Sequence, residues 1–359
     1  MTQKKIKFIQ LQIAEAEDNL RRIQERKSKF VEPTSIPLQL EKDEELHQKN
    51  LTELKEILYR LKIRFKQSRK SRPIPPLLPY LCDRSEQEYH LAKALQKLNQ
   101  QAHRPLVCII HGDDFQSHDM FLERLKQVSL PKLIYPDAGE IAVTDYLLSW
   151  PSRLQKIDDL HNQLEKKLAD RLLNRSFVSK EEINQFLVGH PGPVIIHTHL
   201  LTEDLQQHGS KIIENFFLFW QNWPDILPGK YLFICLFIKY QLPKKIGLNK
   251  FCFKFKNKNV SNFIKQLSSS NFYQFDRLIC TVLPELDSIT RRQTEDWARD
   301  KDTRIFWGEE RIEDLIIKIR DIFEQWEKEK SSNTIPMEYL ARNLTEILQN
   351  CSISKEERK

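Results

Sequence analysis

Eight residues after a short apolar stretch have the spacing of a phosphate-binding loop. Residues 112–119, Gly-Asp-Asp-Phe-Gln-Ser-His-Asp, follow the apolar residues 106–110 and precede a stretch with helical periodicity. In a working loop of the form G-x-x-x-x-G-K-[ST], backbone N–H groups and a lysine hold the phosphates at the start of a helix, and a hydroxyl holds Mg²⁺. The chemistry that this spacing suggests is therefore nucleotide binding.

Three of the four defining positions of that loop are changed. Gly112 is retained, but Ser117 stands at the second glycine, His118 at the lysine and Asp119 at the magnesium-binding hydroxyl. The carboxylate of Asp119 would repel a polyphosphate in a partly desolvated pocket. We therefore expect a degenerate site with weak nucleotide binding or none, and no nucleotide cofactor. A divergent ATP- or GTP-binding switch that uses His118 is the main alternative.

A nucleotide hydrolase also needs an acidic residue at the end of a second apolar strand, where it holds Mg²⁺. The sequence predicts such a strand over 194–196, but His197-Thr-His199 ends it, and Glu203 and Asp204 come too late to be trusted. Two parts of a phosphate site are thus missing together. We expect no catalytic residue and no enzyme activity.

Two other patterns contain the residue types of a chemical site. His197 and His199 alternate along the predicted strand and could share a metal ion, but no acid or cysteine is close in sequence, so we favour a polar strand end and no metal. Ser117, His118 and Asp119 are the residue types of a hydrolytic triad. Consecutive residues cannot generally align as nucleophile, base and orienting group, so we discount the triad.

The elements that must position these residues are predicted to form an α/β core over residues 80–350. Apolar strands are predicted over 106–110, 194–196 and 231–238, with a short one near 133–135 followed by Asp137, and helices are predicted from about 140 to 189, over 212–220 and near 311–327 and 337–348. Apolar strands separated by helices are typical of a mainly parallel sheet covered on both faces. The predicted fold is therefore a P-loop-NTPase-like parallel sheet with a degenerate nucleotide site.

Residues 1–70 are predicted to form an all-α coiled-coil hairpin in front of that core. Apolar residues recur at three- and four-residue spacing on both sides of a segment with two prolines. A hairpin of this size has little core of its own, so we expect it to bind a helical protein partner or to form a homo-oligomer. The apolar positions expected at that interface are Ile9, Ile13, Leu20, Leu51, Leu54 and Leu58. An intramolecular spacer is the alternative, and a proline-rich linker is predicted over 71–79.

All of the excess positive charge lies in the N-terminal segment. Residues 1–72 contain 18 Lys and Arg against 11 Asp and Glu, a net +7 that equals the net charge of the whole chain. The basic run that includes Arg60, Lys62, Arg64 and Lys66 could bind an anion such as a nucleic acid. Few aromatic residues accompany it, so we expect a solvated helix face, and a nucleic-acid-associated regulator is the second alternative.

The sequence predicts a cytoplasmic protein with no membrane partner. Its longest apolar run, residues 231–238, is far shorter than the roughly 20 residues that cross a bilayer, and the N-terminus lacks the pattern of a signal peptide. The six cysteines are scattered and form no C-x-x-C pair. We expect them to be free, mostly buried thiols that hold neither a disulfide nor a metal.

Five short segments occur in an order that resembles the inactive STAND family of bacteria. They are residues 79–88, 108–113, 219–225, 233–240 and 283–290, and the resemblance covers roughly 75–350. It implies a core like that of the STAND signalling ATPases with an eroded phosphate loop, and the hairpin is similar to the helical adaptors placed before such cores. Lys239-Tyr240 lies near the position where active relatives carry an arginine. The implied function is a non-enzymatic signalling adaptor or hub in a bacterial conflict or immune-like system.

Overall fold

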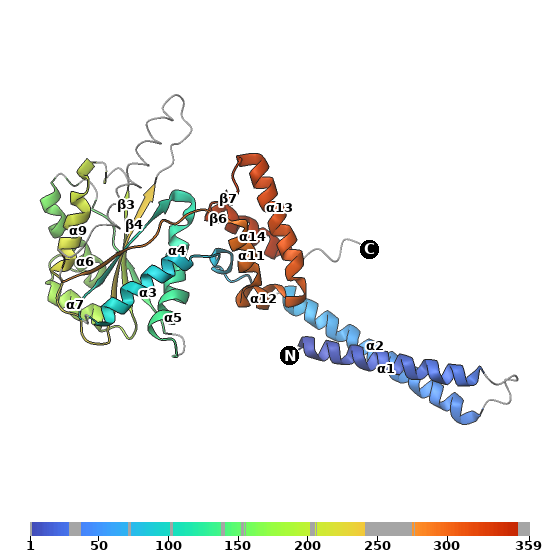
Figure 1. Ribbon diagram of the computed structural model, residues 1–359. Coiled ribbons are helices and arrows are strands. Elements are labelled where there is room, and N and C mark those ends of the chain that lie inside the picture. Colours follow the sequence, from blue (N-terminus) through green and yellow to red (C-terminus); the bar gives the residue numbers. More distant parts are fainter. Residues whose placement is uncertain are drawn as a thin grey trace. The chain divides into compact units, whose positions relative to one another are not determined.

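The computed structural model describes residues 2–28, 37–70, 73–100, 103–137, 141–151, 154, 156–201, 205, 207–240, 275 and 277–350, without the side chains of 2–6, 61–70, 201, 240 and 350. The chain divides into two compact units, residues 1–74 with 348–359 and residues 75–347. Figure 1 shows the elements of each. Within these described ranges, no helix combines the length and the hydrophobicity that crossing a bilayer requires.

The first unit contains the predicted helical hairpin. Helix α1 (Thr2–Lys27) and helix α2 (Leu38–Lys70) run antiparallel. Ion pairs join them at two levels, from Lys27 to Glu44 at 2.6 Å and from Lys55 to Glu17 at 2.8 Å. The apolar spacing places one stripe of each helix against the other, and the side chains buried there include Ile13, Ala16 and Ile23.

The second unit is built on a parallel sheet of five strands in the order β2-β3-β4-β1-β5. The strands are β1 (Leu106–Asp113), β2 (Thr144–Leu147), β3 (Val194–Leu201), β4 (Leu232–Tyr240) and β5 (Ile279–Val282). All four strand pairings are parallel. The predicted α/β fold is confirmed. β1 lies between β4 and β5, so the segment after its carboxyl end emerges where ligands bind in open α/β sheets.

Helices cover both faces of this sheet (Figure 1). One face packs against α6 (Leu160–Leu173), α7 (Lys180–Val188) and α9 (Lys211–Gln221), and the other against α3 (Ser85–Gln100), α4 (His118–Arg124), the π-helical turn η4 (Leu125–Ser129) and α5 (Leu130–Ile134). The aromatic run of α9, including Phe216, Phe219 and Trp220, is fully buried. These rings are therefore core residues.

The region between β1 and β3 corrects two sequence predictions. The residues near 133–135, predicted as a strand, end α5 instead, and β2 lies at 144–147, where helix was predicted. Pro131 cannot donate a backbone hydrogen bond, and the helix accommodates it directly after the wider π turn. β2 was missed because it is a half-buried edge strand without an apolar run. Asp137 is exposed beyond a helix, and not at a strand end.

A helical region follows the sheet in the same unit. It contains α11 (Arg291–Arg299), α12 (Lys301–Trp307), α13 (Ile312–Lys330) and α14 (Met337–Asn350), and the short strands β6 (Ile289–Thr290) and β7 (Thr334–Ile335) pair antiparallel. Single 3₁₀ turns occur at η2 (Leu78–Tyr80), η3 (Asp114–Gln116), η5 (Ile157–Asp159) and η7 (Glu309–Arg311). Thr290 and Gln293 form a capping box that begins α11.

Candidate nucleotide site

The loop after β1 connects a buried strand to the start of a helix. β1 runs on to Asp113, whose carboxylate accepts a hydrogen bond from the N–H of Phe115 at 3.0 Å and so closes the turn η3. Ser117 adopts the left-handed conformation, with φ 53° and ψ 54°. This is the position of the second glycine in the motif, and α4 begins at His118, the position of the lysine. Two local features expected of the motif, a left-handed residue and a helix start, therefore occur at the expected positions.

His118 fills this loop with its own side chain. The imidazole is 1% exposed, and its Nε2 donates a hydrogen bond to the backbone carbonyl of Asp113 at 3.0 Å. Because a carbonyl can only accept, the proton of the neutral ring lies on Nε2. Burial lowers the pKa of His118 to about 4, so the ring is neutral at pH 7. The position of the phosphate-binding lysine thus carries no positive charge.

Close packing of two backbone segments explains why position 112 has a glycine. A Cβ atom added to it would lie 2.9 Å from both the Cβ and the carbonyl oxygen of Leu286. The N–H of Leu286 donates to the carbonyl of His111 at 2.8 Å, so the segment after β5 is hydrogen-bonded beside the loop. The space that a glycine leaves for a phosphate is occupied here by the chain itself.

Gln116 is the second buried polar residue of the loop, at 3% exposure. Its Oε1 accepts from the guanidinium of Arg84 and from the N–H of Met337, each at 3.4 Å, and its Nε2 donates to the Oγ of Ser288 at 3.2 Å. Sequence reasoning missed these partners. Arg84 and Ser288 lie 32 and 172 residues away from Gln116, and no local pattern marks them.

Asp119, at the position of the magnesium-binding hydroxyl, lies near one lysine and one histidine of the protein. Its Oδ1 lies 3.8 Å from the Nζ of Lys239 and 3.8 Å from the Nε2 of His199, and its side chain is 79% exposed. Burial and the nearby charge of Lys239 lower the pKa of His199 to about 4. The basic group predicted near the end of β4 is therefore placed beside this carboxylate, while the side chain of Tyr240 lies outside the described residues.

β3 corrects the prediction for the histidine pair. The strand continues to Leu201, so His197 and His199 lie inside it and do not end it. β2 pairs with β3 only as far as His197, whereas β4 pairs with it as far as Leu201 and so extends the strand despite its polar residues. Glu203 and Asp204, the acids that follow, lie outside the described residues.

His197 has an acidic neighbour that the sequence does not reveal. Its Nε2 is 3.3 Å from the carboxylate of Asp145 on β2, which also pairs with Lys126 at 2.7 Å. Burial lowers the pKa of His197. The Nδ1 atoms of His118, His197 and His199 are buried without a hydrogen-bond partner. Even so, among the described residues no three His, Cys, Asp or Glu side chains are arranged to hold a metal ion.

The residues predicted at a partner interface lie along the hairpin. Ile13 is buried, whereas Ile9, Leu20, Leu51, Leu54 and Leu58 are half-buried. Of the predicted anion-binding residues, Arg60 forms an ion pair with Glu56 on the same helix. The side chains of Lys62, Arg64 and Lys66 lie outside the described residues.

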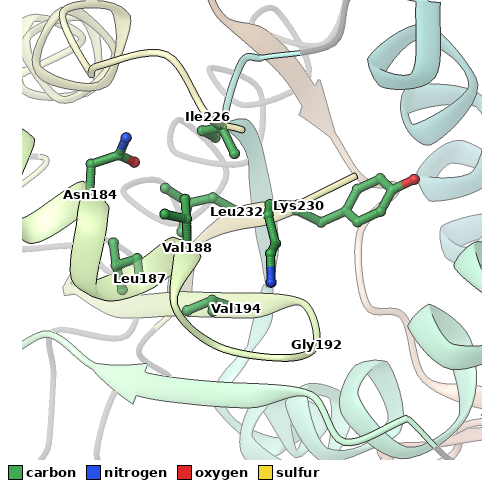
Figure 2. Close-up of a pocket in the computed structure, with 9 residues that line it drawn as sticks. Asn184, Leu187, Val188, Gly192, Val194, Ile226, Lys230 and Leu232 are labelled. Carbon is green, nitrogen blue, oxygen red and sulfur yellow. The ribbon is translucent and has the colours of Figure 1, made fainter. Parts of the chain in front are cut away.

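A small cavity lies at the amino ends of β3 and β4, whereas the loop follows the carboxyl end of β1. Figure 2 shows residues that line the cavity. Its volume is about 10 Å³, which is room for about one water molecule. Val194 and Leu232, at the amino ends of β3 and β4, line it together with Asn184 and Lys230. The ends of Asn184 and Lys230 are already engaged by the backbone carbonyls of Asp225 and His190, so this cavity is not a nucleotide site.

The comparison with protein families agrees with the resemblance seen in the sequence. A model of the inactive STAND family matches residues 79–238. Among solved structures, a chain in the structure of Drosophila ORC bound to DNA is 11% identical, with a TM-score of 0.35 over 80% of this chain and 59% of that chain. The Aeropyrum pernix ORC1 protein in complex with DNA is 12% identical, with a TM-score of 0.27 over 74% of this chain and 66% of that chain. This chain thus spans less than two thirds of either one. No curated protein matches it.

Proposed function

We propose that this protein, which carries an inactive STAND domain over residues 79–238, is a non-enzymatic signalling adaptor or hub. The observation that carries the proposal is the phosphate loop filled by its own buried side chains. His118 bonds to the carbonyl of Asp113 and Gln116 bonds to three other segments, so the loop is satisfied without a ligand. The core then serves as a scaffold, and the signal passes through protein contacts.

The loop opposes nucleotide binding through both charge and space. A triphosphate at this position would meet the neutral ring of His118 where a lysine normally stands, and the carboxylate of Asp119 where a hydroxyl normally holds the metal. To clear the loop, His118 would have to leave a site in which it is 1% exposed. The free energy that binding released would have to exceed the cost of breaking that buried hydrogen bond.

The hairpin is the part of the chain that we propose binds a partner. Its half-buried apolar stripe and the exposed side chains of Phe8 (59%) and Leu11 (70%) offer apolar surface that a matching helical module could cover. The partner would be a protein with a similar hairpin or a second copy of this chain. A bacterial conflict or immune-like system is the setting that the family resemblance favours.

The cytoplasm is the compartment that we propose. Cys82, Cys108 and Cys235 are buried free thiols, and Cys280 is free and partly exposed. Unpaired cysteines of this kind suit a reducing compartment. Cys252 and Cys351 lie outside the described residues.

Calorimetric titration of the full chain with Mg-ATP and Mg-GTP tests the core. We expect no binding heat at micromolar to millimolar nucleotide. The matched variant carries Ser117→Gly, His118→Lys and Asp119→Thr together, which restores the motif residues without changing the rest of the site. Micromolar binding by the unaltered chain would overturn the adaptor proposal and favour the divergent switch.

Pull-down and analytical ultracentrifugation of the full chain test the hairpin. We expect the chain to capture a helical partner or itself, and the double variant Phe8→Ser with Leu11→Ser to lose that capture. Leu227→Ser, which removes an exposed apolar side chain (57%) from the other unit, is the matched control. If the unaltered chain shows neither self-association nor a partner, the proposal fails. Salt-dependent retention on DNA or RNA would favour the nucleic-acid alternative instead.

A further inference from the structure

The loop after β1 contacts the first turn of α14 directly. The ring of Phe115 lies 5.1 Å from that of Tyr339, centroid to centroid, at an interplanar angle of 40°. Next to it, Oε1 of Gln116 accepts the N–H of Met337. Met337 is the first residue of α14, and N–H groups in the first turn of a helix have no partner within the helix. The loop side chain therefore satisfies an N–H group that would otherwise be buried and unpaired.

A buried arginine ties a third segment to the same amide. Arg84 is 5% exposed and donates both to Oε1 of Gln116 and, at 2.9 Å, to the carbonyl of Asp287. Burial lowers its pKa to about 10, so the guanidinium is still charged at neutral pH. A buried charge without acceptors is strongly destabilising, so Arg84 holds its acceptors close to one another. Ser288 completes the group through Nε2 of Gln116.

We propose that Arg84, Phe115 and Gln116 form a latch that fixes the start of α14 and the connection at residues 287–288 against the loop without any bound ligand. The inference does not depend on the partner of the hairpin. The loop that would otherwise contact a phosphate contacts a helix of the same chain. The orientation of α14 relative to the sheet is therefore set by the protein alone, and adding nucleotide leaves it unchanged.

Outside the latch, β6 pairs with β7, which ends two residues before α14, and two further sets of hydrogen bonds hold nearby segments. Gln87 donates to the carbonyls of Pro284 and Glu285, and Trp297 donates to the carbonyl of Leu78. These bonds hold the residues after β5 and helix α11, but none of them reaches α14. Breaking the latch should therefore loosen the first turn of α14 while the sheet and α11 stay in place.

Hydrogen–deuterium exchange of the full chain tests the latch. In Gln116→Ala we expect the peptide that contains Met337 to Leu340 to exchange about tenfold faster, as the loss of a buried hydrogen bond implies. Peptides from α9 should not change. Gln127→Ala is the matched control, because it removes an exposed glutamine whose side chain bonds to Glu123 in the adjacent helical turn.

A second variant keeps the test decisive if Gln116→Ala does not fold. Phe115→Ala removes only the half-buried ring against Tyr339 and should speed exchange of the same peptide by a smaller factor. Unchanged exchange in this peptide in folded Gln116→Ala and Phe115→Ala would overturn the latch. Millimolar Mg-ATP should not change the exchange of this peptide in the unaltered chain. If Mg-ATP slows that exchange, the proposal that the latch forms independently of a ligand is wrong.

Discussion

His118 should make the stability of the second unit depend on pH in the acid range. Its pKa is lowered from 6.5 to about 4 by burial, so the folded protein resists the protonated form that the unfolded chain accepts below pH 6.5. The stabilisation is complete above pH 6.5 and is lost as the pH falls toward 4. From the difference between the two pKa values, the free energy of unfolding falls relative to neutral pH by about 3 kcal/mol at pH 4 and by about 2 kcal/mol at pH 5.

The groups around His118 sharpen this expectation. Lys239 and His199 both lower its pKa by charge, while the carbonyls of Asp113 and Gly112 raise it. Protonating the ring would place a buried cation near the partly exposed Lys239, with the exposed carboxylate of Asp119 as the compensating charge. The desolvation penalty is therefore larger than the attraction that offsets it. His199 also has a pKa of about 4, so its protonation further lowers the stability of the folded unit over the same pH range.

Urea unfolding followed by tryptophan fluorescence at pH 7.5 and pH 5 measures the effect. His118→Gln keeps an N–H donor that can reach the carbonyl of Asp113 but does not titrate, so the unaltered protein should lose about 2 kcal/mol more than this variant between the two pH values. His90→Gln, at an exposed site on α3, should behave like the unaltered protein. An identical pH dependence in the unaltered protein and in His118→Gln would refute the reasoning.

Three further changes test the packing around the loop, each by urea unfolding. Gly112→Ala should destabilise the unit by about 1–3 kcal/mol, because its Cβ would lie 2.9 Å from Leu286; a loss below the error of the measurement would contradict the close approach. Ser117→Gly should raise the stability by up to about 1 kcal/mol, because glycine adopts the left-handed conformation without a Cβ clash; a loss would show that the hydroxyl has an unseen role. Asp145→Asn should cost about 1 kcal/mol and should change the titration of His197 in NMR spectra, and an unaltered titration would count against their pairing.

The length of apolar runs explains which elements could be predicted from the sequence. β1 and β4 are continuous buried runs, and their positions were predicted to within about three residues. β2 is a short edge strand with two polar residues and one aromatic residue in four, so only its pairing with β3 defines it. The end of β3 was placed too early because His197, Thr198 and His199 look like a polar terminus in the sequence, although β4 continues beside all three of them.

In the candidate site, too, the sequence predicts what depends on neighbouring residues and misses what depends on residues far along the chain. The sequence identifies Gly112, Ser117, His118 and Asp119 as a changed motif, because their spacing is local. The sequence does not reveal which residues occupy the place of a ligand. The side-chain oxygen of Gln116 accepts a hydrogen bond from Met337, which lies 221 residues away. Long-range hydrogen bonds of this kind depend on the finished fold and leave no periodic pattern.

Gly112 shows why a motif fragment alone is weak grounds for nucleotide binding. A glycine at this position suits the close approach of a phosphate, but in this chain the same absence of a side chain admits Leu286. A glycine at position 112 would suit either a bound phosphate or close backbone packing. Only the atoms beside it distinguish these two roles. Because those atoms belong to the protein, with His118 and Gln116 buried beside them, the loop can keep its backbone form in the absence of nucleotide.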